Sequence, residues 1–132
     1  MKKDTGNTMI IVDTDVLIEI FDKKSTKGDL ALKKIENTDE DIAITSLNLH
    51  EILYGIHKYG KKKIKGIEQL ETIEFNRDDA RLSSKLELQC EKKGKKVARM
   101  DTMIAAIAIN RKSKLFTFNQ KHFQVIPGLS LL

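Results

Sequence analysis

Short runs of β-branched and other apolar residues alternate along the chain with longer stretches of helical periodicity. This alternation is typical of βαβ units arranged around a parallel sheet. The runs are apolar at consecutive positions, as expected of strands that helices cover on both faces. The predicted strands are residues 9–13 (MIIVD), 41–45 (DIAIT), 71–75 (ETIEF), 114–118 (KLFTF) and 124–126 (QVI). The pattern therefore predicts an α/β domain with a mostly parallel central sheet.

Four stretches have the apolar spacing of helices. They are residues 28–36, 46–58, 77–93 and 101–112. A further helix, TDVLIEIF, is expected directly after the first strand. Ser46 and Asn76 are of types that cap helix N-termini, and Gly94 suits the position after a helix C-terminus. The stretch 101–112 is apolar nearly all round, so we expect this helix to lie in the core.

The length of 132 residues suits one domain that buries a core without crosslinks. We predict a flexible extension at residues 1–8 and a single domain at residues 9–132. The lone Cys90 cannot form an internal disulfide, and acids interrupt the first apolar run, so we expect a cytoplasmic protein with no membrane span. The formal charge of +5 is compatible with a nucleic acid partner, although many soluble proteins share such an excess.

Two carboxylates stand where the functional crevice of a parallel sheet is expected, beyond the carboxyl ends of the strands. Asp13 closes the first strand, and Asp101 opens the buried helix. Each also suits a helix N-cap, and that structural role stays open for both residues. Asp15 follows in the first turn after Asp13, and we interpret it as a supporting residue.

Glu51 is the carboxylate that helical periodicity places least clearly. It lies on the opposite side of its helix from the apolar stripe, which predicts exposure to solvent. Leu47 and Tyr54 share its side, so a half-buried position at the edge of that face is the alternative.

Asp13, Glu51 and Asp101, gathered at one edge of the sheet, would raise one another's pKa unless a cation lay between them. Oxygen ligands suit Mg²⁺ or Mn²⁺, and the sequence has no Cys and His spacing typical of zinc sites. Such a cation activates water for in-line attack on a phosphodiester and stabilises the departing oxygen. Together with the basic charge, this chemistry points to a nuclease.

Four blocks of the sequence, taken in order, resemble those of PIN-domain nucleases. They are IIVDTDVLIE, AITSLNLHEILYG, ARMDTMIAAIAI and KLFTFNQKHFQVIPGL, which together span about residues 9–129. Within that family the chain is most similar to VapC-type toxins, the small endoribonucleases of toxin–antitoxin pairs. The resemblance implies a three-layer α/β/α fold, RNA cleavage that depends on Mg²⁺ or Mn²⁺, a VapB-like antitoxin that blocks the acidic site, and a homodimer.

The resemblance also assigns roles to individual residues. Asp13, Glu51 and Asp101 correspond to the acidic triad that binds the metal and catalyses hydrolysis. Thr117 and Asn119 match polar residues that support the site, and we expect them to hold water or to orient Asp13.

His122 stands where the family often has a fourth acid. This substitution leaves open whether one metal or two operate, and it makes the imidazole a candidate for contact with RNA phosphate. The basic cluster EKKGKKVAR (residues 91–99) runs directly into Asp101. Its default role is solvated surface charge, but Lys95, Lys96 and Arg99 are placed to meet RNA phosphates near the metal.

Three other functions are alternatives, and the sequence does not exclude the first. A stand-alone PIN nuclease in RNA processing would share all the catalytic blocks. A catalytically impaired PIN module that binds RNA or protein agrees with the missing fourth acid but not with the intact triad. A phosphate-binding switch protein would need a Gly-rich loop after the first strand, and the sequence has none there.

Overall fold

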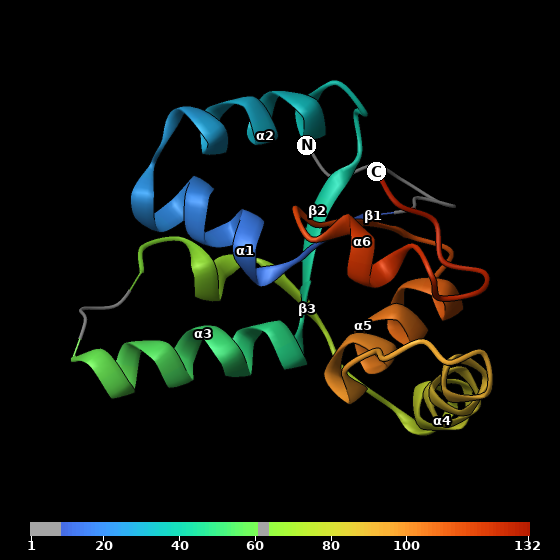
Figure 1. Cartoon of the computed structure of the whole chain (residues 1–132). Coiled ribbons are helices and arrows are strands. Elements are labelled where there is room, and N and C mark those ends of the chain that lie inside the picture. The colour runs from blue at the N-terminus through green and yellow to red at the C-terminus, as the bar shows by residue number, and fades with distance from the viewer. Residues whose placement is uncertain (1–8, 61–63) are drawn as a thin grey trace.

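A four-stranded parallel sheet forms the centre of the protein, with strand order β3-β2-β1-β4 (Figure 1). The strands are β1 (Met9–Val12), β2 (Asp41–Thr45), β3 (Glu71–Ile73) and β4 (Lys114–Phe116). The computed structural model describes residues 9–60 and 64–132, so the extension predicted at residues 1–8 lies outside the described residues. All the pairings are parallel, which confirms the predicted sheet.

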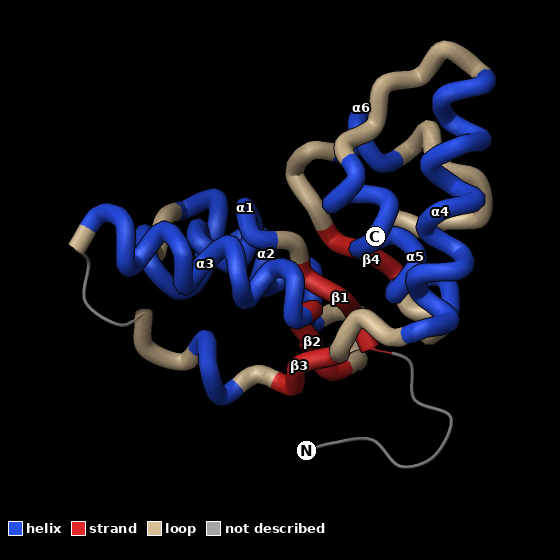
Figure 2. Tube along the Cα trace, turned by 90° about the horizontal axis from the view of Figure 1, so that it is seen from below, coloured by secondary structure: helices blue, strands red, loops and turns tan. Residues whose placement is uncertain are grey.

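The helices form a layer on each side of this sheet. Their bounds are α1 (Thr14–Leu17), η1 (Ile18–Lys23, a π-helix), α2 (Thr26–Glu36), α3 (Ser46–Tyr59), η2 (Ile67–Gln69, a 3₁₀-helix), α4 (Arg77–Lys92), α5 (Arg99–Asn110) and α6 (Gln120–Phe123). Figure 2 shows α1, α2 and α3 on one side and α4, α5 and α6 on the other. The three-layer α/β/α architecture is therefore confirmed. No helix in the described ranges is long and apolar enough to cross a membrane.

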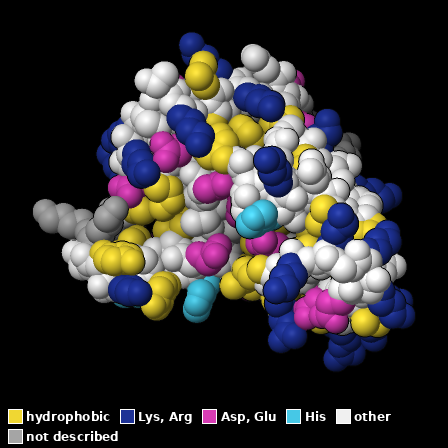
Figure 3. Space-filling view, in the orientation of Figure 1, with side chains coloured by type: hydrophobic (Ala, Val, Ile, Leu, Met, Phe, Trp, Pro, Cys, Tyr) yellow, Lys and Arg dark blue, Asp and Glu magenta, His cyan; other side chains and the backbone are white. Residues whose placement is uncertain are grey.

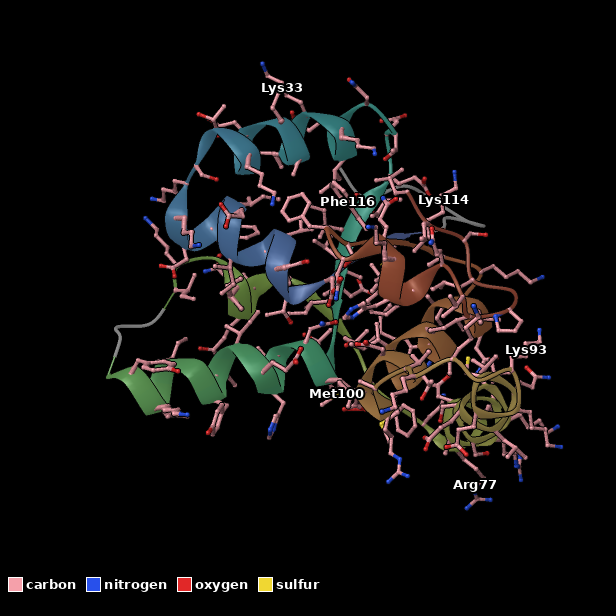
Figure 4. The ribbon with its side chains drawn as sticks, viewed as in Figure 1. Lys33, Arg77, Lys93, Met100, Lys114 and Phe116 are labelled. Carbon is pink, nitrogen blue, oxygen red and sulfur yellow. The ribbon has the colours of Figure 1, made fainter. Side chains whose placement is uncertain are left out.

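The alternation of side chains along each strand builds two hydrophobic cores, one on each face. Ile10 and Val12 of β1 pack into the core beneath α2 and α3, whereas Ile11 packs into the core against α4 and α5. Phe116 of β4 points toward α2, and its neighbour Leu115 joins the opposite core (Figure 4). Helix α5 is buried, as its uniformly apolar sequence predicted.

Several predicted boundaries are confirmed and others are wrong. Asn76 caps α4 and forms a reciprocal capping box with Asp79. Gly94 has a φ of +71° after the end of α4, as the prediction required. Ser46, however, is not the cap of α3, because Thr45 accepts the capping hydrogen bond from the Asn48 amide.

The predicted strand at residues 124–126 is wrong. The chain turns there, with Ile126 N–H bonded to the Phe123 carbonyl, and the apolar side chain of Ile126 is buried in the core instead. Strands β3 and β4 also end earlier than predicted, at Ile73 and Phe116. An apolar residue can be buried in the core without belonging to a strand. A short apolar run therefore predicts burial but does not by itself predict strand pairing.

An ion pair between the buried Asp79 and the partly buried Arg111 joins α4 to the end of α5. Asp79, fully buried in α4, accepts hydrogen bonds of 2.8 Å from both Arg111 Nη1 and Asn110 Nδ2. Its other oxygen accepts from Arg111 Nη2 and from the Asn76 backbone. The start of α4 is thereby held against the end of α5, the helix that carries Asp101.

Candidate active site

The carboxyl ends of β1 and β4 bring Asp13 and Thr117 together. Asp13 Oδ2 accepts a hydrogen bond of 2.8 Å from the Thr117 hydroxyl, 104 residues further along the chain. Asp13 Oδ1 accepts from the Thr14 backbone and, at 3.0 Å, from Asn48 Nδ2. Asp13 is thus the N-cap of α1, as predicted, and its second oxygen is held by Thr117 at the same edge of the sheet.

Asn48 is a site residue that the sequence did not identify. It is fully buried, and its amide oxygen accepts a 2.6 Å hydrogen bond from the Thr45 hydroxyl. Its nitrogen donates to both Asp13 Oδ1 and Thr14 Oγ1. The capping pattern Thr45-Ser46-Leu47-Asn48 was the available signal, since an N-cap threonine places the side chain three residues later at the helix entrance.

Glu51 follows Asn48 by one turn of α3 and belongs to the same edge. Its side chain is exposed, as periodicity predicted, but Oε1 accepts a 2.8 Å hydrogen bond from the Thr14 hydroxyl. Thr14 therefore joins two carboxylates, because its backbone N–H also donates to Asp13.

Asp101 lies in the first turn of α5, whose N-cap is Ala98, so Asp101 is not the cap that its position suggested. Burial and the Asp13 carboxylate raise the pKa of Asp101 to about 6. The imidazole of His122 opposes this rise, whereas Glu51 and Asp15 add to it. Asp101 is thus within the electrostatic reach of every predicted acidic residue of the site.

Asp15 supports the site through a hydrogen bond with the backbone next to Thr117. Its Oδ2 accepts a hydrogen bond from the Phe118 backbone, which ties α1 to the segment that carries Thr117. Its Oδ1 is buried and has no hydrogen-bond partner among the described residues. Burial, and then the charge of Asp13, raise the pKa of Asp15.

The donor set fits a divalent cation. Within residues 9–60 and 64–132 no three acids or imidazoles form a ready-made metal cluster. Burial and the charge of Asp13 raise the pKa of both Asp15 and Asp101, and Asp15 has a buried oxygen without a donor, so a cation bound between these acids would offset their repulsion. Carboxylate oxygens are ligands that Mg²⁺ and Mn²⁺ prefer.

Asn119 and His122 form a second part of the site. The Asn119 backbone donates to the Thr117 hydroxyl, but its side chain lies 2.8 Å from His122 Nδ1 rather than on Asp13. Asn119 therefore does not contact Asp13 directly, and its only link to Asp13 among these hydrogen bonds runs through the Thr117 hydroxyl. Figure 3 shows acidic side chains and a histidine gathered around a hollow on this face.

Of the three basic residues predicted to contact RNA, one is paired with an acid. Lys95 and Lys96 are exposed on the segment between α4 and α5. The Arg99 guanidinium instead pairs with Glu87 through hydrogen bonds of 3.0 Å from Nε and Nη2. Further positive charge, including Arg77 and Lys93, extends from α4 (Figure 4).

Comparison with known proteins agrees with this geometry. Residues 10–129 match the family model of the PIN domain. The chain belongs to the PIN-domain family. It is 32% identical to ribonuclease VapC2 of Rickettsia felis over 129 residues, covering 92% of this chain and 94% of the relative. It is 28% identical to ribonuclease VapC1 of Methanocaldococcus jannaschii, covering 98% of this chain and 90% of the relative.

Solved structures of similar proteins have the same fold. The crystal structure of VapBC2 from Rickettsia felis, bound to a DNA fragment from their promoter, superposes with a TM-score of 0.79 at 27% identity. The match covers 95% of this chain and 98% of that chain. DNA-bound VapBC from Salmonella typhimurium has a TM-score of 0.77 at 24% identity, covering 95% and 97% of the two chains. The PIN-domain resemblance of the four sequence blocks is confirmed.

Proposed function

We propose that this PIN-domain protein is a metal-dependent endoribonuclease that acts as the toxin of a toxin–antitoxin pair. The observation that carries the proposal is that Thr14 donates hydrogen bonds to both Asp13 and Glu51, and that burial and the charges of these two acids raise the pKa of Asp101. The similarity to proteins named ribonuclease VapC supports RNA as the substrate. The solved VapBC complexes support a VapB-like antitoxin as partner, and a homodimer is the assembly we expect.

Asp13, Asp101 and Glu51 are the residues that would hold Mg²⁺ or Mn²⁺. When bound, the ion lowers the pKa of water and offsets negative charge on the phosphodiester. Asp13 keeps its orientation because Thr117 and Asn48 donate to separate oxygens of its carboxylate.

Glu51, which accepts a hydrogen bond from Thr14, would orient the water that attacks the phosphorus in line. Lys95 and Lys96 would contact RNA phosphates beside the acids, since both are exposed on the segment that leads into α5. Arg99 would have to leave Glu87 before it could do the same.

Purified protein, free of any partner, tests the proposal directly. We expect endonucleolytic cleavage of RNA when Mn²⁺ or Mg²⁺ is added and no cleavage in EDTA. Failure to cleave with either ion would favour a module that only binds RNA or protein. Expression without a partner should inhibit growth, and co-expression of the gene product encoded beside it should restore growth. Cleavage without growth inhibition would instead indicate a stand-alone RNA-processing nuclease.

A further inference from the structure

The imidazole of His122 lies on α6, which begins three residues after Thr117, the residue whose hydroxyl donates to Asp13. It lowers the pKa of Asp101, whereas Asp13, Glu51 and Asp15 raise it. His122 is exposed on α6, so its ring is accessible to a ligand that reaches Asp101. An anionic substrate at this edge meets repulsion from the acids, and a hydrogen-bond donor beside them would offset part of it.

Successive hydrogen bonds tie the backbone of the segment that carries His122 to Asp13. The Thr117 hydroxyl donates to Asp13 Oδ2, and the Asn119 backbone N–H donates to the Thr117 oxygen. The His122 backbone N–H donates to the Asn119 carbonyl at 3.1 Å. The position of His122 is therefore set by the same segment that orients Asp13.

The side chain of Asn119 determines which ring nitrogen of His122 carries the proton. Asn119 Nδ2 lies 2.8 Å from His122 Nδ1, and an amide nitrogen is a donor only. Nδ1 therefore accepts, and the neutral ring carries its proton on Nε2. An Nε2–H group is a hydrogen-bond donor in the neutral ring as well as in the charged ring.

We propose that His122 contacts the substrate, donating from Nε2–H to a phosphate oxygen of the RNA backbone beside Asp101, and that Asn119 is the positioning residue that selects this tautomer. The inference rests on the proposed function for its substrate class. It differs from a role of the imidazole as metal ligand, which would need a lone pair on Nε2 and a proton on Nδ1.

Nitrogen NMR of the histidine rings tests the tautomer without RNA or metal. In wild-type protein above neutral pH we expect the proton of His122 on Nε2, and in Asn119→Ala a shift toward a mixture of tautomers. Asn119 makes no side-chain cap bond to α6, so this variant leaves the helix cap unchanged. A proton on Nδ1 in the wild type would overturn the proposal. Movement of the ring proton to Nδ1 on addition of Mg²⁺ would overturn it as well, because Nε2 would then be a metal ligand.

RNA binding tests the contact independently of cleavage. With fluorescently labelled RNA and Ca²⁺ in place of Mg²⁺, His122→Ala should weaken binding about tenfold, the usual scale for a hydrogen bond to a charged group. His122→Gln, which can present a donor near the same place, should stay within about threefold of wild type. His57→Ala on α3 is the matched control and should bind like wild type.

Kinetics then separate this role from a structural one. His122→Ala should raise KM for RNA more than it lowers kcat, and its thermal unfolding should match that of His57→Ala. Equal binding by His122→Ala and wild type would contradict the inference even if RNA is cleaved. Weakened binding by His122→Ala in a protein that never cleaves RNA would support the contact and reject the nuclease.

Discussion

The hydroxyl of Thr14 donates a hydrogen bond of 2.8 Å to Glu51, although the two residues are 37 positions apart in the chain. This contact joins α1 to α3 at the carboxyl edge of the sheet. Without it, an exposed glutamate would sample many rotamers, so Thr14 restricts Glu51 to rotamers that reach the start of α1.

Thr14→Val should therefore lower RNA cleavage while the fold is kept. Valine matches threonine in shape but can neither donate to Glu51 nor accept from Asn48, whose amide nitrogen keeps its other acceptor on Asp13. The loss of the exposed hydrogen bond to Glu51, about 1 kcal/mol, corresponds to about fivefold in rate. Cleavage kinetics with Mn²⁺ measure the effect. Thr72→Val, on the exposed edge strand β3, is the control, and an equal loss in that variant would contradict a specific role for Thr14.

Asp13→Asn should reduce cleavage by at least about a hundredfold, because an amide is a poor ligand for a hard cation and removes one negative charge. Asparagine is also a good N-cap, so α1 and the melting temperature should change little. Asp78→Asn, which alters an exposed carboxylate of α4, should retain full activity. Undiminished cleavage by Asp13→Asn would remove the metal hypothesis.

Asp101→Asn should stabilise the metal-free protein at pH 7 while abolishing cleavage. The folded-state pKa of Asp101 is about 6, above its ordinary value, so ionisation costs stability as pH rises from about 4 to 6. The gain in melting temperature in EDTA should shrink as pH falls through that window and vanish below it. Mn²⁺ should raise the melting temperature of wild type but not of the variant. A variant less stable than wild type at pH 7 would contradict this interpretation.

Asp79→Asn should cost about 3–5 kcal/mol of unfolding free energy, because it leaves Arg111 half-buried without its counter-ion. Burial acts to raise the pKa of Asp79, but hydrogen bonds from Arg111 and Asn110 outweigh it, so the pKa is lowered. This contribution to stability is present at neutral pH and is lost as pH falls through that lowered pKa. Denaturant unfolding at pH 7 measures it, and Asp78→Asn, with a cost below about 0.5 kcal/mol, is the matched control.

The elements that the sequence predicted correctly are those with strong local signals. The buried runs of β1 and β2, the apolar helix α5 and the capping box of Asn76 each follow from neighbouring residues. The errors lie where the same local pattern is compatible with two different structures. The run 124–126 packs in the core without forming a strand, and Thr45 rather than Ser46 caps α3.

The same distinction holds for the site. Asp13 and Asp101 were found because each follows or opens a buried element, and parallel strands place their carboxyl ends together. Asn48 was missed, since a buried asparagine within a helix gives no periodic signal. Arg99 was expected near RNA, but Glu87, twelve residues before it, binds its guanidinium.

The sequence by itself determined the parallel sheet, the buried helix and the types of side chain that reach the sheet edge, because these depend on periodicity and on residues close in the chain. Only the tertiary structure decided which of those side chains meet. The hydrogen bonds from Thr117 to Asp13 and from Thr14 to Glu51 join residues 104 and 37 positions apart, and each forms because the packing of the elements brings donor and acceptor to 2.8 Å. Hydrogen bonds are short-ranged and directional, so such contacts are set by packing rather than by pattern.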